Sequence, residues 1–256
     1  MDKLYIEKLG RGSKKFLFLP GITGTVNYWK PYLQPYISEG EFILVDPLGF
    51  GRSPKPNIKY TIENHINYLY KSIKAEGGPF TIVGHSMGSL LAIHFAHKYS
   101  DLVEKLVLIG VPAFKSKKQA KRHFYKQLRF SVTTIPIAAA ACVISRIVIK
   151  YFSPILKRTK MWDSLMIDDM LMHTWKSYTS SLWEVVYQSD IFNISHDIPK
   201  SIPVICLHGT KDKSAPLLNL KELIDNNNWE IYIQPTGTHS IFIENPKWCM
   251  EYILSH

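Results

Sequence analysis

The chain has 256 residues, of which 46% are hydrophobic and 20% are charged, with a net charge of +10. This length suits one large domain, with room for a substantial insertion, and the composition excludes a disordered chain and a bundle of membrane helices. Thirteen Lys and Arg residues but no Asp or Glu lie between Lys105 and Trp162, which favours contact with a surface or an acidic ligand over nucleic-acid binding, since no motif for the latter accompanies the charge.

Signals for export or membrane insertion are not evident. The first ten residues include Asp2 and Glu7 and lack the apolar core of a signal peptide. No stretch of about 18 residues is both uncharged and strongly apolar, so we expect no membrane-spanning helix. The cysteines Cys142, Cys206 and Cys249 cannot all pair and lack the spacing of metal ligands. We therefore expect reduced thiols in a cytoplasmic protein.

Short apolar runs open the chain. Leu4–Leu9 and Phe16–Leu19 are separated by Gly10, Gly12 and Ser13, a pattern that predicts a hairpin. Three later runs are apolar throughout, as expected of strands buried on both faces of a parallel sheet: Phe42–Val45, Phe80–Val83 and Leu106–Ile109. Helical patterns lie between them: Thr61–Ala75 and Ser89–Tyr99.

Pro112 ends this alternation, and residues 113–191 have a helical pattern without a clear buried strand. The alternation then resumes with two strands and two helices: Val204–Leu207, Leu217–Asp225, Glu230–Ile233 and a last helix from Pro246. The order predicts an α/β fold with a mostly parallel sheet flanked by helices. Residues 1–112 and 192–256 would form its core, and residues 113–191 a helical insertion.

The strongest chemical signal is the sequence Gly84-His85-Ser86-Met87-Gly88, between a predicted strand and a predicted helix. This is the G-x-S-x-G nucleophile elbow in its required context. The two glycines allow a tight, strained turn that exposes the Ser86 hydroxyl at the carboxyl end of the sheet. We predict that Ser86 is a nucleophile.

A serine hydroxyl needs a base and a group that orients the base. Elbow enzymes place these partners in the order Ser, acid, His. Asp212 follows the strand Val204–Leu207, and His239 follows the strand Glu230–Ile233, so both lie where loops leave the carboxyl ends of strands. We predict that His239 removes the Ser86 proton and that Asp212 holds the imidazole tautomer.

Other histidines and acids fit these roles less well. Chain order and geometry disfavour three histidines as the base: His85, His94 and His97. His208 is expected to pack at a strand end, and Asp46 is expected to be structural. Asp190 and Asp197 are alternative acids, although both precede the strand Val204–Leu207 instead of following it.

Two backbone N–H groups are expected to stabilise the oxyanion of the transition state. One is that of Met87, the residue after the nucleophile. The other should come from the loop Leu19–Gly24, with Ile22 N–H the favoured donor and Thr23 the alternative. Each such donor contributes roughly 3–4 kcal/mol to transition-state stabilisation.

Together these residues resemble the α/β-hydrolase superfamily over nearly the whole chain apart from the insertion. The matching parts are the Pro20-Gly21 loop with Trp29, the segment Asp46–Ser53, the Ser86 elbow, Gly209–Asp212, and His239 with Glu244-Asn245-Pro246. Many relatives have His-Gly where this chain has Pro20-Gly21. Because only backbone donation is required there, the departure leaves the oxyanion hole intact.

The resemblance implies a helical cap inserted after the sixth strand, which residues 113–191 would supply. Within it, Ile135–Ile144 is apolar but too short to span a bilayer. It would line an acyl pocket, rest on a membrane surface beside the basic residues, or pack in its own core. Three tryptophans are candidate substrate contacts: Trp29, Trp162 and Trp183.

The expected activity is that of a serine hydrolase, most simply a carboxylesterase that cleaves a hydrophobic acyl ester through an acyl-enzyme on Ser86. The alternatives of the same fold are a thioesterase, an acyl-lactone hydrolase and a carbon–carbon bond hydrolase. A ligand-binding receptor that retains the triad is the alternative of another class. The resemblance implies no metal or organic cofactor, and it leaves the oligomeric state open.

Overall fold

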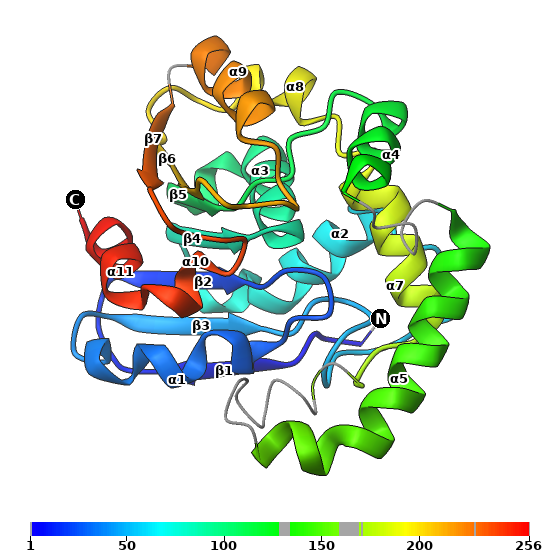
Figure 1. The fold of residues 1–256 in the computed structure, drawn as a ribbon. Helices are drawn as coiled ribbons and strands as arrows, with labels where there is room; N and C mark the ends of the chain where they lie inside the picture. Colours follow the sequence, from blue (N-terminus) through cyan, green and yellow to red (C-terminus); the bar gives the residue numbers. More distant parts are fainter. Residues whose placement is uncertain (1, 128–133, 159–168, 170, 228, 256) are drawn as a thin grey trace.

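The computed structural model describes residues 2–127, 134–158, 169, 171–227 and 229–255 (Figure 1). In this part of the chain, seven strands form one sheet in the order β1-β3-β2-β4-β5-β6-β7. Their bounds are Ile6–Leu9 (β1), Lys15–Leu19 (β2), Glu41–Val45 (β3), Phe80–His85 (β4), Val103–Ile109 (β5), Val204–Gly209 (β6) and Glu230–Gln234 (β7). β1 runs antiparallel to β3, and the other pairings in this sheet are parallel.

The predicted hairpin at the start of the chain is wrong. β1 pairs with β3, whereas β2 lies between β3 and β4, so β1 and β2 are not neighbours. Composition explains the difference. β1 includes Glu7 and Lys8 and is only partly buried, which suits the edge of the sheet. β2 is almost entirely buried and therefore occupies the interior of the sheet.

Helices cover both faces of the sheet, and alternate residues of β2 point to opposite faces. Phe16 and Phe18 join an apolar cluster with helices of one face: α1 (Lys30–Leu33), α10 (Ile241–Glu244) and α11 (Pro246–Leu254). Leu17 and Leu19 join a cluster with helices of the other face: α2 (Ile62–Ile73), α3 (Met87–Lys98), α8 (Ile191–Ile194) and α9 (Leu217–Asn227). The result is a three-layer α/β arrangement (Figure 1).

Residues 113–191, hereafter the inserted segment, are helical where the structure describes them. They include α4 (Lys117–Lys126), α5 (Ile135–Arg158), α7 (Trp175–Ser181) and a π-helical turn (Leu182–Val186). The segment follows β5, so among the described residues five strands precede it, and not the six that the resemblance implied. Figure 1 shows α4, α5 and α7 along one side of the molecule.

α5 extends well beyond the apolar decapeptide seen in the sequence. Its stretch Ile135–Ser153 is, by length and composition, long and apolar enough to cross a membrane. The sequence analysis thus missed an apolar stretch of this length, whereas the expectation that no helix spans a membrane stays a prediction. Arg146 and Lys150 interrupt the apolar sequence, but a helix of this length retains enough apolar residues around them.

His65 connects the core to the inserted segment. It is buried on α2, and its Nε2 lies 3.1 Å from the Ser181 hydroxyl of α7. Burial lowers the pKa of His65 from 6.5 to about 3. The folded protein therefore holds this imidazole neutral over most of the acidic range.

We expect the contribution of His65 to make the free energy of unfolding depend on pH. Between pH 3 and 6.5 the unfolded chain binds a proton at this residue that the folded chain does not bind. The free energy of unfolding is thus not reduced by His65 above pH 6.5, the pKa of the unfolded state. It falls by up to about 1.4 kcal/mol per pH unit as the pH is lowered from 6.5 towards 3. Urea unfolding over a pH series should show a shallower slope for His65→Gln than for the exposed control His196→Gln. Equal slopes for both variants would contradict this assignment.

Candidate active site

Ser86 lies in a sharp turn between β4 and α3. Its backbone has φ 52° and ψ −116°, a conformation that costs a non-glycine residue about 1–3 kcal/mol. The Ser86 N–H donates to the Ile109 carbonyl of β5 at 2.9 Å, and Ser89 Oγ donates to the Gly84 carbonyl at 2.7 Å. These hydrogen bonds anchor both sides of the turn to the sheet and hold Ser86 at the carboxyl end of β4.

Gly88 allows α3 to begin directly against the loop Leu19–Gly24. A Cβ atom at this position would lie 2.0 Å from the Leu19 carbonyl oxygen and 2.7 Å from that of Pro20. No side chain fits within such distances, so the close approach requires glycine. The second glycine of the elbow motif thus brings the nucleophile and the predicted oxyanion loop together.

His239 and Asp212 form a hydrogen-bonded pair, with 2.7 Å between His239 Nδ1 and Asp212 Oδ2. The other carboxylate oxygen, Oδ1, accepts the N–H groups of Ser214 (2.7 Å) and Ala215 (2.9 Å). Burial acts to raise the pKa of Asp212, but the hydrogen bond and charge of His239, with the Ala215 N–H, hold it below its usual value. The carboxylate is therefore ionised at neutral pH and keeps the proton of a neutral His239 on Nδ1.

Gly110, directly after β5, makes room for this pair. Its φ is +58°, and a Cβ atom there would lie 3.2 Å from His239 Nδ1 and 3.3 Å from Asp212 Oδ2. A side chain at this position would both strain the backbone and press on the Asp–His hydrogen bond. Gly110 was not among the residues predicted from the sequence, although a glycine at the end of a central strand was the available signal.

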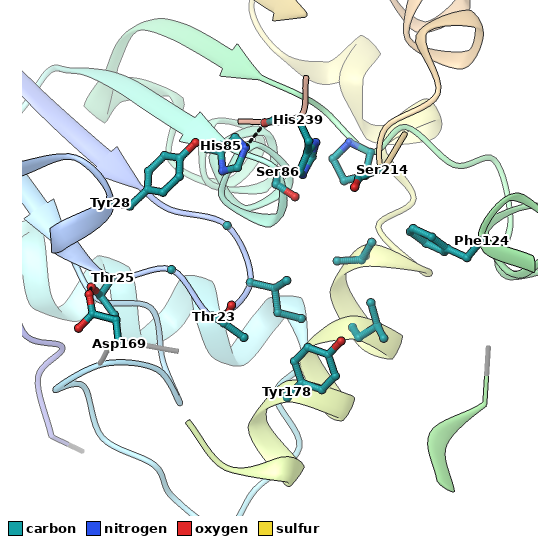
Figure 2. A pocket seen from close by; sticks show the side chains of 16 residues that line it. Thr23, Thr25, Tyr28, His85, Ser86, Phe124, Asp169, Tyr178, Ser214 and His239 are labelled. Carbon is teal, nitrogen blue, oxygen red and sulfur yellow. Dashed lines mark hydrogen bonds between the residues drawn. The ribbon is translucent and has the colours of Figure 1, made fainter. Parts of the chain in front are cut away.

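Ser86 and His239 line the same cavity, which has a volume of about 390 Å³ (Figure 2). Among the described residues, Ser86 Oγ is not hydrogen-bonded to His239. In active sites without substrate, catalytic hydrogen bonds are often long and tighten only in the complex. The structure thus brings the three predicted residues to one site, with the Asp–His hydrogen bond already formed.

His85 is next to the nucleophile but is not available as a base. Its Nε2–H donates to the His239 carbonyl oxygen at 2.8 Å, so that nitrogen is already used. Burial, together with the nearby His239, lowers the pKa of His85 to about 3. The neutral ring also stacks on Tyr28, with 4.7 Å between ring centroids. His85 therefore positions the backbone of His239, and the prediction that it is not the base stays a prediction.

The two N–H groups predicted to form the oxyanion hole are free to donate. Met87 is the first residue of α3, where backbone N–H groups have no partner within the helix. Ile22 lies in the cavity wall. Within the described part of the chain, neither N–H has a protein acceptor. The neighbouring Thr23 has a positive φ of 63°, so this loop is held in a conformation that is unusual for a non-glycine residue.

Two buried carboxylates hold the residues that follow this loop. Asp46 accepts the Val26 N–H and the Arg52 N–H, each at 2.7 Å, which supports a structural role. From the inserted segment, Asp169 accepts the Thr25 hydroxyl and the Asn27 side-chain amide. Asp169 also lines the cavity. No local sequence pattern pointed to Asp169, because its partners lie more than 140 positions away.

Two of the three tryptophans predicted to contact substrate, Trp29 and Trp183, lie outside the cavity lining. Trp29 is fully buried and packs against Phe18 and Phe242 beneath the site, with centroid distances of 5.1 Å and 4.6 Å. Trp183 is also buried and packs against Tyr187. Neither is among the residues that line the cavity, so this geometry does not support substrate contact for them. Trp162 lies outside the described residues.

Apolar side chains of the inserted segment form the wall of the cavity opposite Ser86 (Figure 2). They are Phe124, Tyr178, Leu182 and Val186. The described lining includes no Lys or Arg, and within the described residues no group of His, Cys, Asp and Glu is arranged to hold a metal ion. The volume lies near the lower end of the roughly 300–1,000 Å³ typical of small-molecule sites.

The sequence profile of the alpha/beta hydrolase fold family matches residues 14–246. The chain belongs to this family. It is 27% identical over 202 residues to a probable lysophospholipase, BODYGUARD 4 of Arabidopsis thaliana, a match that covers 68% of this chain and 46% of that protein. The chain spans half or less of the length of such BODYGUARD relatives.

A second relative matches this alpha/beta hydrolase more fully. The 2-hydroxy-6-oxo-6-(2'-aminophenyl)hexa-2,4-dienoic acid hydrolase of Metapseudomonas resinovorans is 27% identical over 264 residues, covering 96% of this chain and 84% of that protein. Among solved structures, an esterase from Exiguobacterium antarcticum superimposes with a TM-score of 0.75 at 19% identity, over 98% of this chain and 96% of that chain. The structural likeness confirms the predicted fold.

Proposed function

We propose that this alpha/beta hydrolase is a serine esterase that cleaves carboxylic esters with an apolar acyl group. The observation that carries the proposal is the meeting of a strained Ser86 and a part-buried, hydrogen-bonded Asp212–His239 pair at one apolar cavity. Esterases and lysophospholipases among the similar proteins support the same reaction class.

In the proposed mechanism, His239 Nε2 removes the Ser86 proton while Oγ attacks the ester carbonyl. Asp212 stabilises the imidazolium that forms. The backbone N–H groups of Ile22 and Met87 donate to the developing oxyanion, and the proton on His239 passes to the leaving alcohol. Water activated by His239 then attacks the acyl-enzyme, and cleavage of the Ser86–acyl bond releases the acid and regenerates the serine.

The cavity supports an uncharged, apolar acyl chain as the preferred substrate. Four apolar side chains of the inserted segment face the nucleophile: Phe124, Tyr178, Leu182 and Val186. The one carboxylate among the described lining residues, Asp169, is already hydrogen-bonded to Thr25 and Asn27. Because no Lys or Arg is present in the described lining, an anionic acyl group would lack a counter-charge there. We propose that the inserted segment acts as the cap of this site.

Carbon–carbon bond cleavage is the second candidate, because the relative from Metapseudomonas resinovorans covers most of both chains. The name of that relative gives a dienoic acid as its substrate, and the carboxylate of such a substrate would need a counter-charge that the described cavity lining does not provide. Thioester and lactone hydrolysis use the same acyl-enzyme and remain within the proposed reaction class.

The test is a substrate panel with the purified chain: p-nitrophenyl esters of increasing acyl length, a matching thioester and lactone, and a 2-hydroxy-6-oxo-dienoic acid. We expect multiple turnovers on neutral esters, with kcat of at least about 1 s⁻¹, and none on the dienoic acid. A fluorophosphonate should label Ser86. Tight binding of esters without turnover would instead indicate a receptor, and turnover of the dienoic acid alone would replace the esterase assignment.

A further inference from the structure

The large apolar side chains of α5 point away from the protein. Eight of its described apolar side chains are exposed: Ile135, Ile137, Val143, Ile144, Ile147, Val148, Tyr151 and Phe152. Tyr151 is 75% exposed and Ile144 is 59% exposed. The side of α5 that packs against the protein carries small residues, since Ala138 and Cys142 are its buried positions. A helix on the surface of a globular protein normally has the opposite arrangement.

These exposed residues form a continuous surface. Ile144 is three and four residues from Ile147 and Val148, which are in turn four residues from Tyr151 and Phe152, so these side chains share one face of the helix. An apolar area of this kind marks a site of contact with another apolar phase or molecule. The cavity at Ser86 does not explain it, because none of these residues lines that cavity.

Positive charge lies on the same side of the molecule as this apolar face. Lys150 is exposed on α5 itself, and α4 carries four exposed basic residues: Lys117, Lys118, Arg122 and Lys126. α4 and α5 lie along the same side of the molecule (Figure 1). From Lys105 to Trp162 the sequence contains no acidic residue that would offset these charges. Because the described cavity lining lacks Lys and Arg, the basic residues do not serve substrate binding in the cavity.

The combination of apolar and basic groups indicates which kind of partner this surface binds. Two copies of this chain that met through this side would bring like charges together, which disfavours self-association. An anionic lipid bilayer offers both complements: acyl chains for the apolar face, and negative headgroups for the lysines and arginines.

Contacts of α5 favour a helix that lies on the bilayer over one that crosses it. α5 packs along α7, and Cys142 Sγ lies 3.2 Å from His173 Nε2. Arg146, half-buried against the protein, and the exposed Lys150 both fall within the apolar stretch. A spanning helix would have to leave these contacts and carry both charges into the hydrocarbon.

We propose that α5 is an interfacial helix that docks the protein on anionic lipid bilayers, with its Ile144–Phe152 face in the acyl region and the basic residues of α4 at the headgroups. The contact does not involve Ser86, so it is independent of the proposed esterase activity.

The experiment measures binding of the purified full chain to vesicles of phosphatidylcholine, with and without phosphatidylglycerol, by co-flotation. Binding should require the anionic lipid and weaken at high salt. The variant Ile147→Ser/Tyr151→Ser should bind at least tenfold more weakly. Leu218→Ser is the matched control, because Leu218 is 80% exposed on α9, and it should bind like the wild type. Circular dichroism should show both variants folded, since the replaced side chains are exposed.

A second set of variants tests the charges. Each of Lys117→Gln, Lys118→Gln and Arg122→Gln should weaken binding to the anionic vesicles by about fivefold. Lys200→Gln, an exposed lysine outside the inserted segment, should have no effect. Ser86→Ala should bind the anionic vesicles like the wild type. Vesicle binding therefore tests membrane docking separately from ester hydrolysis, and either proposal can fail without the other.

Three results would overturn the proposal. The first is equal binding, or none, to vesicles with and without phosphatidylglycerol. The second is a dimer in light scattering that the Ile147→Ser/Tyr151→Ser variant abolishes, which would assign the apolar face to a second copy. The third is resistance to extraction from cell membranes by alkaline carbonate, which would indicate a spanning helix.

Discussion

Replacing Ser86 with alanine is expected to lower kcat on a p-nitrophenyl ester by about 10⁴- to 10⁶-fold. Without the hydroxyl no acyl-enzyme forms, and the oxyanion donors and His239 alone give only residual catalysis. Steady-state kinetics measures the loss, and the variant should also no longer react with a fluorophosphonate. KM should change much less than kcat, because the cavity walls are untouched.

The fold should survive this substitution. Ser86 Oγ is not hydrogen-bonded to His239, and alanine keeps the same backbone conformation, so the free energy of unfolding should change by less than about 1 kcal/mol. Ser201→Ala, at an exposed serine near β6, is the matched control and should retain full activity. Substantial activity in Ser86→Ala would mean that another group attacks the ester.

Replacing Asp212 with asparagine is expected to lower kcat by about 10⁴-fold. The reason lies in the two carboxylate oxygens. Oδ1 accepts two backbone N–H groups, from Ser214 and Ala215, so the asparagine oxygen must take that position. Its NH₂ group then faces His239 Nδ1 and makes that nitrogen an acceptor. The imidazole proton moves to Nε2, where it blocks removal of the Ser86 proton.

Asp197→Asn is the matched control for this experiment. Asp197 is exposed, was an alternative acid on sequence grounds, and lies 3.7 Å from His97, away from the cavity. Its variant should keep wild-type kcat, and both variants should be compared by thermal unfolding. A greater loss in Asp197→Asn than in Asp212→Asn would reassign the acid.

The sequence was most informative about the site where a functional residue follows a predicted strand. Ser86, Asp212 and His239 each follow a short apolar run, and the carboxyl ends of parallel strands meet at one edge of the sheet. Their convergence was therefore predictable from local patterns. The catalytic roles assigned to them remain predictions that the experiments above address.

Features that depend on distant pairing were not predictable in this way. β2 was assigned to a hairpin because Gly10, Gly12 and Ser13 precede it, but its partners β3 and β4 come later in the chain. The contacts of Asp169 with Thr25 and Asn27 likewise join segments that no local pattern relates.

The length of α5 was not evident from the decapeptide for a different reason. Arg146 and Lys150 interrupt the apolar sequence, whereas a helix places them on its circumference without ending there. The direction of the apolar side chains also depends on what α5 packs against. The decapeptide alone was therefore consistent with a pocket wall, a membrane contact and a core.

The hydrogen bonds from Thr25 and Asn27 to Asp169 have a consequence for the timing of turnover. They connect the loop that presents the Ile22 N–H to a segment that also forms the cavity wall. If that segment swings aside to admit an ester, the loop loses its carboxylate acceptor at the same moment. In the open state the Ile22 N–H would then be poorly placed to stabilise the oxyanion, and ester cleavage would have to wait until the segment closes. The same two hydrogen bonds would thus control both access of substrate to the cavity and the placement of the oxyanion donor.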